Sequence, residues 1–324
     1  MLTPLDTQRL LHGLMGGMSL ASFNLEVRER QARHFEAALD PQLLDELYGL
    51  PRLESLLGHE AHVLPYLDVF DHGQLRRLAD MQRKSGKSGL EVVADCFRQG
   101  STIRVREIEK FDARLSQLAS HVRQQFAAQA DINVYLTPPH KQGFPPHFDI
   151  TDVFIVQCLG KKQWRLFPEY TNQTHLPLPD TCWDPARYQP SGEVEALTLR
   201  PGDVLYLPRG SMHQAFCEER ESLHLTISLA PLTYADLLSK ALNFAADSEL
   251  DLRRRVPWPS EGDSAGVRAL IRQLREQLAQ LAAHVDLSAV ISQEQQALKT
   301  DSKTESNSEL ESAVSALLER SAAR

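Results

Sequence analysis

The feature that most constrains this fold is a series of short apolar runs between about Ile132 and Leu229. The runs are rich in β-branched and aromatic residues and are separated by turns that contain Pro and Gly. They are Val134–Leu136, Val153–Val156, Trp164–Phe167, Val204–Leu207 and Leu225–Ile227. Short strands at this spacing are typical of a β-sandwich or a jelly roll.

Helical patterns flank this β-rich part on both sides. From Met1 to about Gln129 the chain shows helix start signals such as Asp40-Pro41, an N-cap residue followed by proline at the first helical position. A further helix is expected from about Lys110 to before Asp131, because apolar residues recur there at steps of three and four. These residues are Phe111, Leu115, Leu118, Val122 and Phe126.

After Pro231 the helical period returns, with a stop near Pro257 and Pro259. Asp263 or Ser264 caps another predicted helix. The polar stretch from about Gln293 to Ser308 is expected to be a flexible linker before a last short helix.

The predicted fold class is therefore α+β, with a double-stranded β-helix core, a helical lead-in and a C-terminal helical region. The domain division expected is 1–99 for the helix-rich N-terminal region, 100–231 for the β-rich domain, 232–259 for a helical region and 260–324 for terminal helices with the polar linker.

Composition and charge disfavour several functional classes. The chain has 324 residues and a formal charge of −8, which disfavours direct binding to nucleic acid and mildly favours a basic protein partner. No apolar run approaches the roughly 18 residues of a membrane span, and the start of the chain does not resemble a signal peptide, so a cytoplasmic location is expected. The four cysteines lack metal-binding spacing and are expected to be reduced thiols.

His147-Phe148-Asp149 is the first candidate for metal chemistry. About 1.6 His-x-acid triplets are expected by chance from this composition, and three occur, so the triplet alone is weak. His34-Phe35-Glu36 and His284-Val285-Asp286 lie in helical surroundings, where residues two apart point in different directions. His147 and Asp149 begin a strand-like run, where a period of two places both side chains on one face.

The second candidate is the pattern Gly202-x5-Pro208-x-Gly210-x2-His213, which is expected by chance about once in several hundred chains of this composition. Its turns place His213 at the start of a strand, facing the concave side of the sheet. A buried core histidine is the alternative interpretation of His213. Two histidines and a carboxylate form a facial triad, which leaves positions open on iron(II) for a cosubstrate and O2.

A 2-oxoacid with a distal carboxylate would need a fixed cation in the pocket, and Lys162 and Arg165 are the candidates. From spacing alone, a solvated edge-strand lysine is an equally good interpretation of Lys162. His59, His62 and His72 have no partner residue at a recognisable ligand spacing, so no second metal site is predicted.

The runs Asn133–Pro139, Gln142–Asp149, Gly160–Arg165 and Leu199–His213 closely resemble the JmjC-type ribosomal oxygenases of the cupin superfamily. The resemblance covers roughly Gly100 to Pro259. It implies that His147, Asp149 and His213 bind Fe(II). It also implies that 2-oxoglutarate is bound by Lys162 and Asn133, with Tyr135, His224 and Ser228 lining its pocket.

The resemblance further implies a dimerisation bundle after Pro231 and hydroxylation of a side chain on a ribosomal protein, with histidine favoured over arginine. The chain departs from the family in its last residues, which are too few for a complete winged helix, and in lacking a Trp-x-Lys-Lys-Pro stretch. Two alternatives stay open: an oxygenase of the same type that acts on a small molecule or peptide product, and a cupin module that binds a ligand without catalysis.

Overall fold

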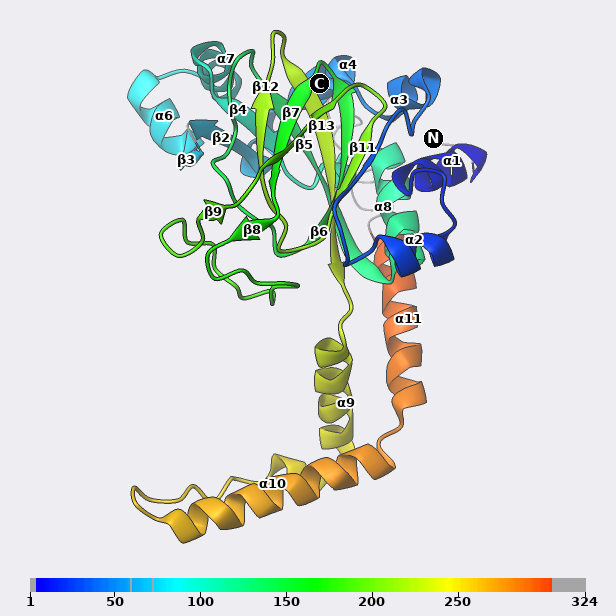
Figure 1. The fold of residues 1–324 in the computed structure, drawn as a ribbon, viewed down its shortest axis with the longest axis vertical. Helices are drawn as coiled ribbons and strands as arrows, with labels where there is room; N and C mark the ends of the chain where they lie inside the picture. Colours follow the sequence, from blue (N-terminus) through cyan, green and yellow to red (C-terminus); the bar gives the residue numbers. More distant parts are fainter. Residues whose placement is uncertain (1–3, 59, 72, 305–324) are drawn as a thin grey trace, which may run out of the picture. The chain divides into compact units, whose positions relative to one another are not determined.

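The computed structural model describes residues 4–58, 60–71 and 73–304. The described chain forms two compact units, one ending at Pro231 and the other running from Leu232 to Lys303 (Figure 1). Strands occur only in the first of these units among the described residues. None of the described helices is long and apolar enough to cross a membrane.

The N-terminal 99 residues contain helices, and they also supply strands to the main sheet. The helices are α1 (Pro4–Leu14), α2 (Leu20–Glu26), α3 (Pro41–Leu47), α4 (Leu50–Leu57), α5 (Glu60–Val63), α6 (Leu78–Ser85) and α7 (Gly89–Gln99). The strands are β1 (Arg33–Phe35), β2 (Leu67–Asp71) and β3 (Gln74–Arg76). The segment is therefore more than a helical lead-in, because its strands pair with strands of the predicted β-rich domain.

The predicted β-rich part folds into two antiparallel sheets and a short ribbon. Eight strands form the large sheet in the order β1-β11-β6-β13-β5-β4-β2-β3, and the small sheet has the order β10-β7-β12. The further strands are β4 (Thr102–Val105), β5 (Ala128–Thr137), β6 (Asp152–Leu159), β7 (Lys162–Phe167), β8 (Glu169–Tyr170), β9 (Pro190–Ser191), β10 (Glu195–Leu199), β11 (Val204–Leu207), β12 (Met212–Cys217) and β13 (Ser222–Pro231). Two antiparallel sheets with helices agree with the predicted α+β class and jelly-roll core.

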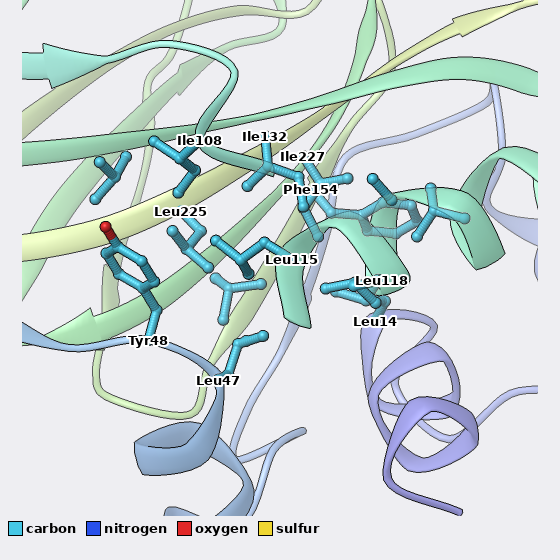
Figure 2. Close-up of a cluster of buried hydrophobic side chains, with 14 of the residues drawn as sticks. Leu14, Leu47, Tyr48, Ile108, Leu115, Leu118, Ile132, Phe154, Leu225 and Ile227 are labelled. Atoms are coloured by element: carbon cyan, nitrogen blue, oxygen red, sulfur yellow. The ribbon is translucent and has the colours of Figure 1, made fainter. Parts of the chain in front are cut away.

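The large sheet has one face for the core and one for a pocket. On β13, Leu225 and Ile227 are fully buried and pack with Ile132 of β5 and Phe154 of β6 (Figure 2). Thr226, which lies between Leu225 and Ile227, points to the opposite face because side chains alternate along a strand. Burial of each such aliphatic side chain contributes about 2 kcal/mol.

Helix α8 (Ala113–Phe126) covers the core face of the large sheet. Asp112 accepts hydrogen bonds from the first backbone amides of the helix, and Leu115 and Leu118 lie against Ile132 and the β13 side chains (Figure 2). Helices α1, α2 and α3 lie on the same side of the sheet (Figure 1). This helical layer leaves the opposite face of the sheet free to form the site.

The second unit consists of helices. They are α9 (Tyr234–Ser248), α10 (Ser264–His284) and α11 (Leu287–Thr304), with a short 3-10 helix at Leu250–Arg253. Thr233 and Asp236 form a capping box at the start of α9, and Asp263 caps α10 as expected.

The predicted linker from Gln293 to Ser308 is wrong over the part that is described, because α11 continues to Thr304. Gln, Glu, Ala and Lys are good helix formers, so a polar composition does not prevent a helix. The glutamate Glu294 also forms an ion pair with Lys240 of α9, 2.8 Å apart. Residues 305–324, including the predicted last helix, lie outside the described part.

Candidate active site

His147 and His213 are joined by a pair of backbone hydrogen bonds. His147 lies in the loop between β5 and β6, and His213 lies in β12. The His147 amide donates to the His213 carbonyl at 3.0 Å, and the His213 amide donates to the His147 carbonyl at 2.7 Å. One side-chain ligand atom each from His147, Asp149 and His213 lies within 4.8 Å of the others. The three predicted ligands therefore come together, although His147 and Asp149 precede the strand instead of beginning it.

The two imidazoles are oriented for metal binding by backbone carbonyls. Nδ1 of His147 lies 2.8 Å from the Pro145 carbonyl oxygen, and Nδ1 of His213 lies 2.9 Å from the Ser211 carbonyl oxygen. A carbonyl only accepts, so each Nδ1 carries the proton and each Nε2 keeps its lone pair. Metal-binding histidines in proteins are oriented in this way.

The electrostatics of the site keep His213 neutral. Its burial lowers its pKa, the neighbouring His147 lowers it further, and Asp149 opposes the shift. A neutral imidazole is the form that binds a metal. Two imidazole nitrogens and one carboxylate suit a non-haem Fe(II) ion, so these residues fit the metal that the sequence predicts.

A pocket of about 100 Å³ extends from these ligands between the two sheets. That volume is several times what one water molecule needs, and it suits a small polar ligand. The residues that line it are Thr102, Arg104, Tyr135, Gly143, Phe144, His147, Asp149, Val153, Ile155, Lys162, Trp164, His213, Ala215, His224 and Thr226.

Lys162 supplies a buried cation to this pocket. Its side chain on β7 is only 2% exposed, and burial lowers its pKa to about 8. Nζ donates to the Thr137 hydroxyl at 3.0 Å and lies 3.4 Å from Nδ1 of His224, while no carboxylate of the described residues pairs with it. Arg165, the other candidate, is exposed and points to the opposite face of β7, so it is not the pocket cation.

Tyr135 and His224 form an aromatic wall beside Lys162. Their rings stack with centroids 4.9 Å apart and an angle of 2° between planes. Burial lowers the pKa of His224 well below its ordinary value, and nearby Lys162 has the same effect. His224 is therefore a neutral hydrogen-bonding group in this pocket.

Asn133 and Ser228 do not line the pocket, in contrast to the sequence prediction. The Asn133 amide donates to the Asp131 carboxylate at 2.9 Å and accepts from the Glu107 backbone at 3.1 Å. The Ser228 hydroxyl donates to the same Asp131 carboxylate. Asn133 shares a face with Tyr135 but lies two residues before it on β5, about 7 Å away.

Arg104, Thr102 and Thr137 are site residues that the sequence reasoning missed. Arg104 lines the pocket, pairs with Asp68 at 2.7 Å and lies over the Tyr135 ring at 6.0 Å from its centroid. The Thr102 hydroxyl donates to the Thr137 hydroxyl at 3.4 Å, next to Lys162. Thr137 lies within the run Asn133–Pro139, which resembles the family, whereas Thr102 and Arg104 belong to β4, where the sequence shows no motif.

His62, from the cluster for which no metal site was predicted, is exposed. His59 and His72 lie outside the described residues.

Comparisons with known proteins agree with this geometry. Residues 106–237 match the model of the JmjC domain. Ribosomal oxygenase 1 of Gallus gallus is 30% identical over 230 residues, which cover 69% of this chain and 38% of that protein. The bifunctional lysine-specific demethylase and histidyl-hydroxylase NO66 of Dictyostelium discoideum is 34% identical over 199 residues, which cover 59% of this chain and 38% of that protein.

Among solved structures, YcfD, a ribosomal oxygenase from Escherichia coli in complex with cobalt and succinic acid, superposes with a TM-score of 0.51. It is 16% identical, and the match covers 83% of this chain and 68% of that one. This likeness supports the fold alone. The chain spans little more than a third of the length of the two curated relatives.

Fold, site and comparisons together define a JmjC-domain protein. Within that class its relatives include ribosomal oxygenase 1, which confirms the resemblance seen in the sequence.

Proposed function

We propose that this protein is an Fe(II)- and 2-oxoglutarate-dependent oxygenase that hydroxylates a side chain of a ribosomal protein. The observation that carries the proposal is the buried cation of Lys162 in the same pocket as His147, Asp149 and His213. A buried ammonium group without a carboxylate partner is costly, and an anionic ligand would compensate for it.

In this proposal His147 and His213 hold the metal through Nε2, and Asp149 through a carboxylate oxygen. The carbonyls of Pro145 and Ser211 fix both imidazoles in the required tautomer. Bound Fe(II) with 2-oxoglutarate and O2 would supply the oxidising chemistry.

Lys162 would pair with the distal carboxylate of 2-oxoglutarate in a site shielded from water. The Thr137 hydroxyl and His224 already hold its ammonium group from two sides, so the cation is placed before the ligand arrives. Tyr135, stacked on His224, would close one wall of the pocket. Asn133 and Ser228 would act indirectly, through Asp131 and the spacing of β5 and β13.

The substrate is proposed from the relatives. One is named a ribosomal oxygenase and another a histidyl-hydroxylase, which supports a ribosomal protein and favours histidine over arginine. The net charge of −8 favours encounter with a basic protein. We propose no direct contact with nucleic acid, and the cytoplasmic location stays a prediction from the sequence.

We also propose a homodimer formed by the second unit. Tyr234, Leu238 and Leu242 recur every four residues on α9 and are all exposed. Helix α10 has a similar exposed series at Val267, Ile271, Leu274 and Leu278. Two apolar stripes of this length are more than a monomer ordinarily leaves in water.

The function is tested by incubating the iron-loaded protein with 2-oxoglutarate and ribosomal-protein peptides. A gain of one oxygen on a histidine-containing peptide, with succinate release, is expected by mass spectrometry. Oxidation confined to a free amino acid or another small molecule would support the alternative oxygenase. Binding of metal and 2-oxoglutarate with no turnover of any of these substrates would support a non-catalytic binding module.

A further inference from the structure

The segment between β7 and β10, residues 168–194, supplies aromatic side chains that pack on the loop of the proposed metal ligands. Phe148, which stands between His147 and Asp149 in the sequence, is buried in an aromatic cluster with Tyr170, Tyr188 and Trp183. The rings of Tyr170 and Phe148 stack with centroids 5.7 Å apart and 29° between planes. Tyr170 itself is only 5% exposed.

The Tyr170 hydroxyl is bound to the turn that precedes His213. Its oxygen lies 2.8 Å from the Gly210 carbonyl oxygen and 3.0 Å from the Thr174 carbonyl oxygen, which share its one proton with the shorter contact to Gly210, and the Thr174 amide donates to it at 3.1 Å. The Gly210 amide in turn donates to the Asp149 carbonyl at 2.9 Å. Gly210 is therefore the single residue between the Tyr170 hydroxyl and the backbone of Asp149.

The same turn also fixes the second imidazole. Ser211 follows Gly210 directly, and its carbonyl accepts the Nδ1 proton of His213 at 2.9 Å. A displacement of the turn would thus move the backbone of Asp149 and the hydrogen-bond partner of His213 together.

The turn at Gly210 is tightly packed against neighbouring backbone. Its φ is +85°, and a Cβ at this position would lie 2.5 Å from the Thr174 carbonyl oxygen and 2.9 Å from Cδ of Pro177. The turn is therefore enclosed by the segment that carries Tyr170.

We propose that Tyr170 is a positioning residue for the metal site: its hydroxyl holds the turn at Gly210 so that Asp149 and His213 meet the ion in one geometry. The inference rests on the proposed metal-binding function. Loss of an outer-shell partner of this kind lowers metal affinity by roughly 10- to 100-fold. The Tyr170 hydroxyl is linked to Asp149 through two hydrogen bonds, so its removal should lower metal affinity by an amount at the low end of this range, about 10-fold.

The test compares Tyr170→Phe with Tyr188→Phe. Both changes remove one hydroxyl from the same aromatic cluster and keep the ring, but the Tyr188 hydroxyl has no hydrogen bond to the described residues, and its ring also packs on Phe148, 5.0 Å away. Cobalt(II) is titrated into each full-length protein and followed by its visible absorption. The dissociation constant should rise about 10-fold in Tyr170→Phe and stay unchanged in Tyr188→Phe.

The rise in melting temperature caused by cobalt is a second readout, which works even in a destabilised variant. It should be smaller for Tyr170→Phe than for the parent and for Tyr188→Phe. Equal cobalt affinities and equal rises for the two variants would overturn the positioning role. If the parent itself binds no cobalt, the proposed function fails instead, so the two failures are distinguishable.

Discussion

Lys162 on β7 and Thr137 at the end of β5 are in direct contact beside the pocket, with the ammonium nitrogen 3.0 Å from the hydroxyl oxygen. The two residues come from different sheets and are 25 positions apart in sequence. This neutral partner satisfies one of the three ammonium protons and leaves the charge itself uncompensated. The buried charge of Lys162 therefore lowers the free energy of unfolding of the ligand-free protein.

Replacing Lys162 by Met should stabilise the protein and abolish 2-oxoglutarate binding. Burial lowers the pKa of Lys162 from 10.5 to about 8, and this shift corresponds to about 3 kcal/mol of destabilisation below pH 8. Loss of the bond to Thr137 offsets about 1 kcal/mol of the gain. Urea unfolding at pH 7 measures the change. Lys161→Met, at an exposed neighbour, should change neither stability nor binding. If the Lys162→Met protein is less stable than the parent, the buried lysine does not destabilise the fold.

The preference of the protein for a distal carboxylate should depend on pH. Below pH 8 the free protein carries Lys162 charged, and above pH 8 the lysine must take up a proton when the carboxylate binds. Affinity for 2-oxoglutarate should therefore fall as the pH rises above about 8, by up to tenfold per pH unit.

The matched ligand for this measurement is 2-oxobutyrate, which lacks the distal carboxylate. Calorimetry of both ligands on the cobalt-loaded protein gives a ratio of affinities from which effects at the metal cancel. The ratio should decline between pH 8 and pH 9.5. A ratio that stays constant over this range would mean that Lys162 does not bind the carboxylate.

Asp149→Ala should abolish turnover and leave the fold intact, because Asp149 is half-buried and its backbone bond to Gly210 remains. Two imidazoles alone cannot close a facial site, so cobalt affinity should fall by more than the roughly 100-fold expected for an outer-shell change. Asp180→Ala, an exposed acid between β7 and β10, is the control. Undiminished iron-dependent turnover in Asp149→Ala would refute the ligand assignment.

Leu238→Glu on α9 should convert a dimer into a monomer, because it places a charge in the exposed apolar stripe. Asn243→Glu is the matched control, since Asn243 lies about 140° around the helix from Leu238. Light scattering at tens of micromolar measures both. A parent protein that is already monomeric at this concentration would contradict the proposed dimer.

The site could be predicted from sequence where the signal was local. His147 and Asp149 are two residues apart, and His213 follows a turn whose glycines are recognisable, so the three residues that the structure brings together were identified, although His147 and Asp149 lie in the loop before β6 and not on a strand face. Lys162 was found by its place after Gly160, but spacing could not separate it from Arg165. Strand alternation in the structure does so, because it buries Lys162 and exposes Arg165.

The pairing of strands that are far apart in the chain could not be predicted from the sequence. Strand β1 has three residues and pairs with β11 about 170 positions later, through Arg33 and Tyr206 among others. No local pattern marks so short a strand, because its stability comes from the partner. Asn133 and Ser228 were misplaced for a related reason: their strands were identified, but their depth along the strands depends on the register between β5 and β13.

The place of β1 at the end of the large sheet has a practical consequence for truncation. Its partner β11 is buried along all four residues, Val204 to Leu207, and would become an uncovered apolar edge in a chain that began at residue 100. Unprotected edges of this kind template intermolecular strand addition. A protein shortened at that boundary should therefore aggregate under conditions in which the whole chain remains dispersed. The N-terminal segment thus protects the sheet edge from self-association.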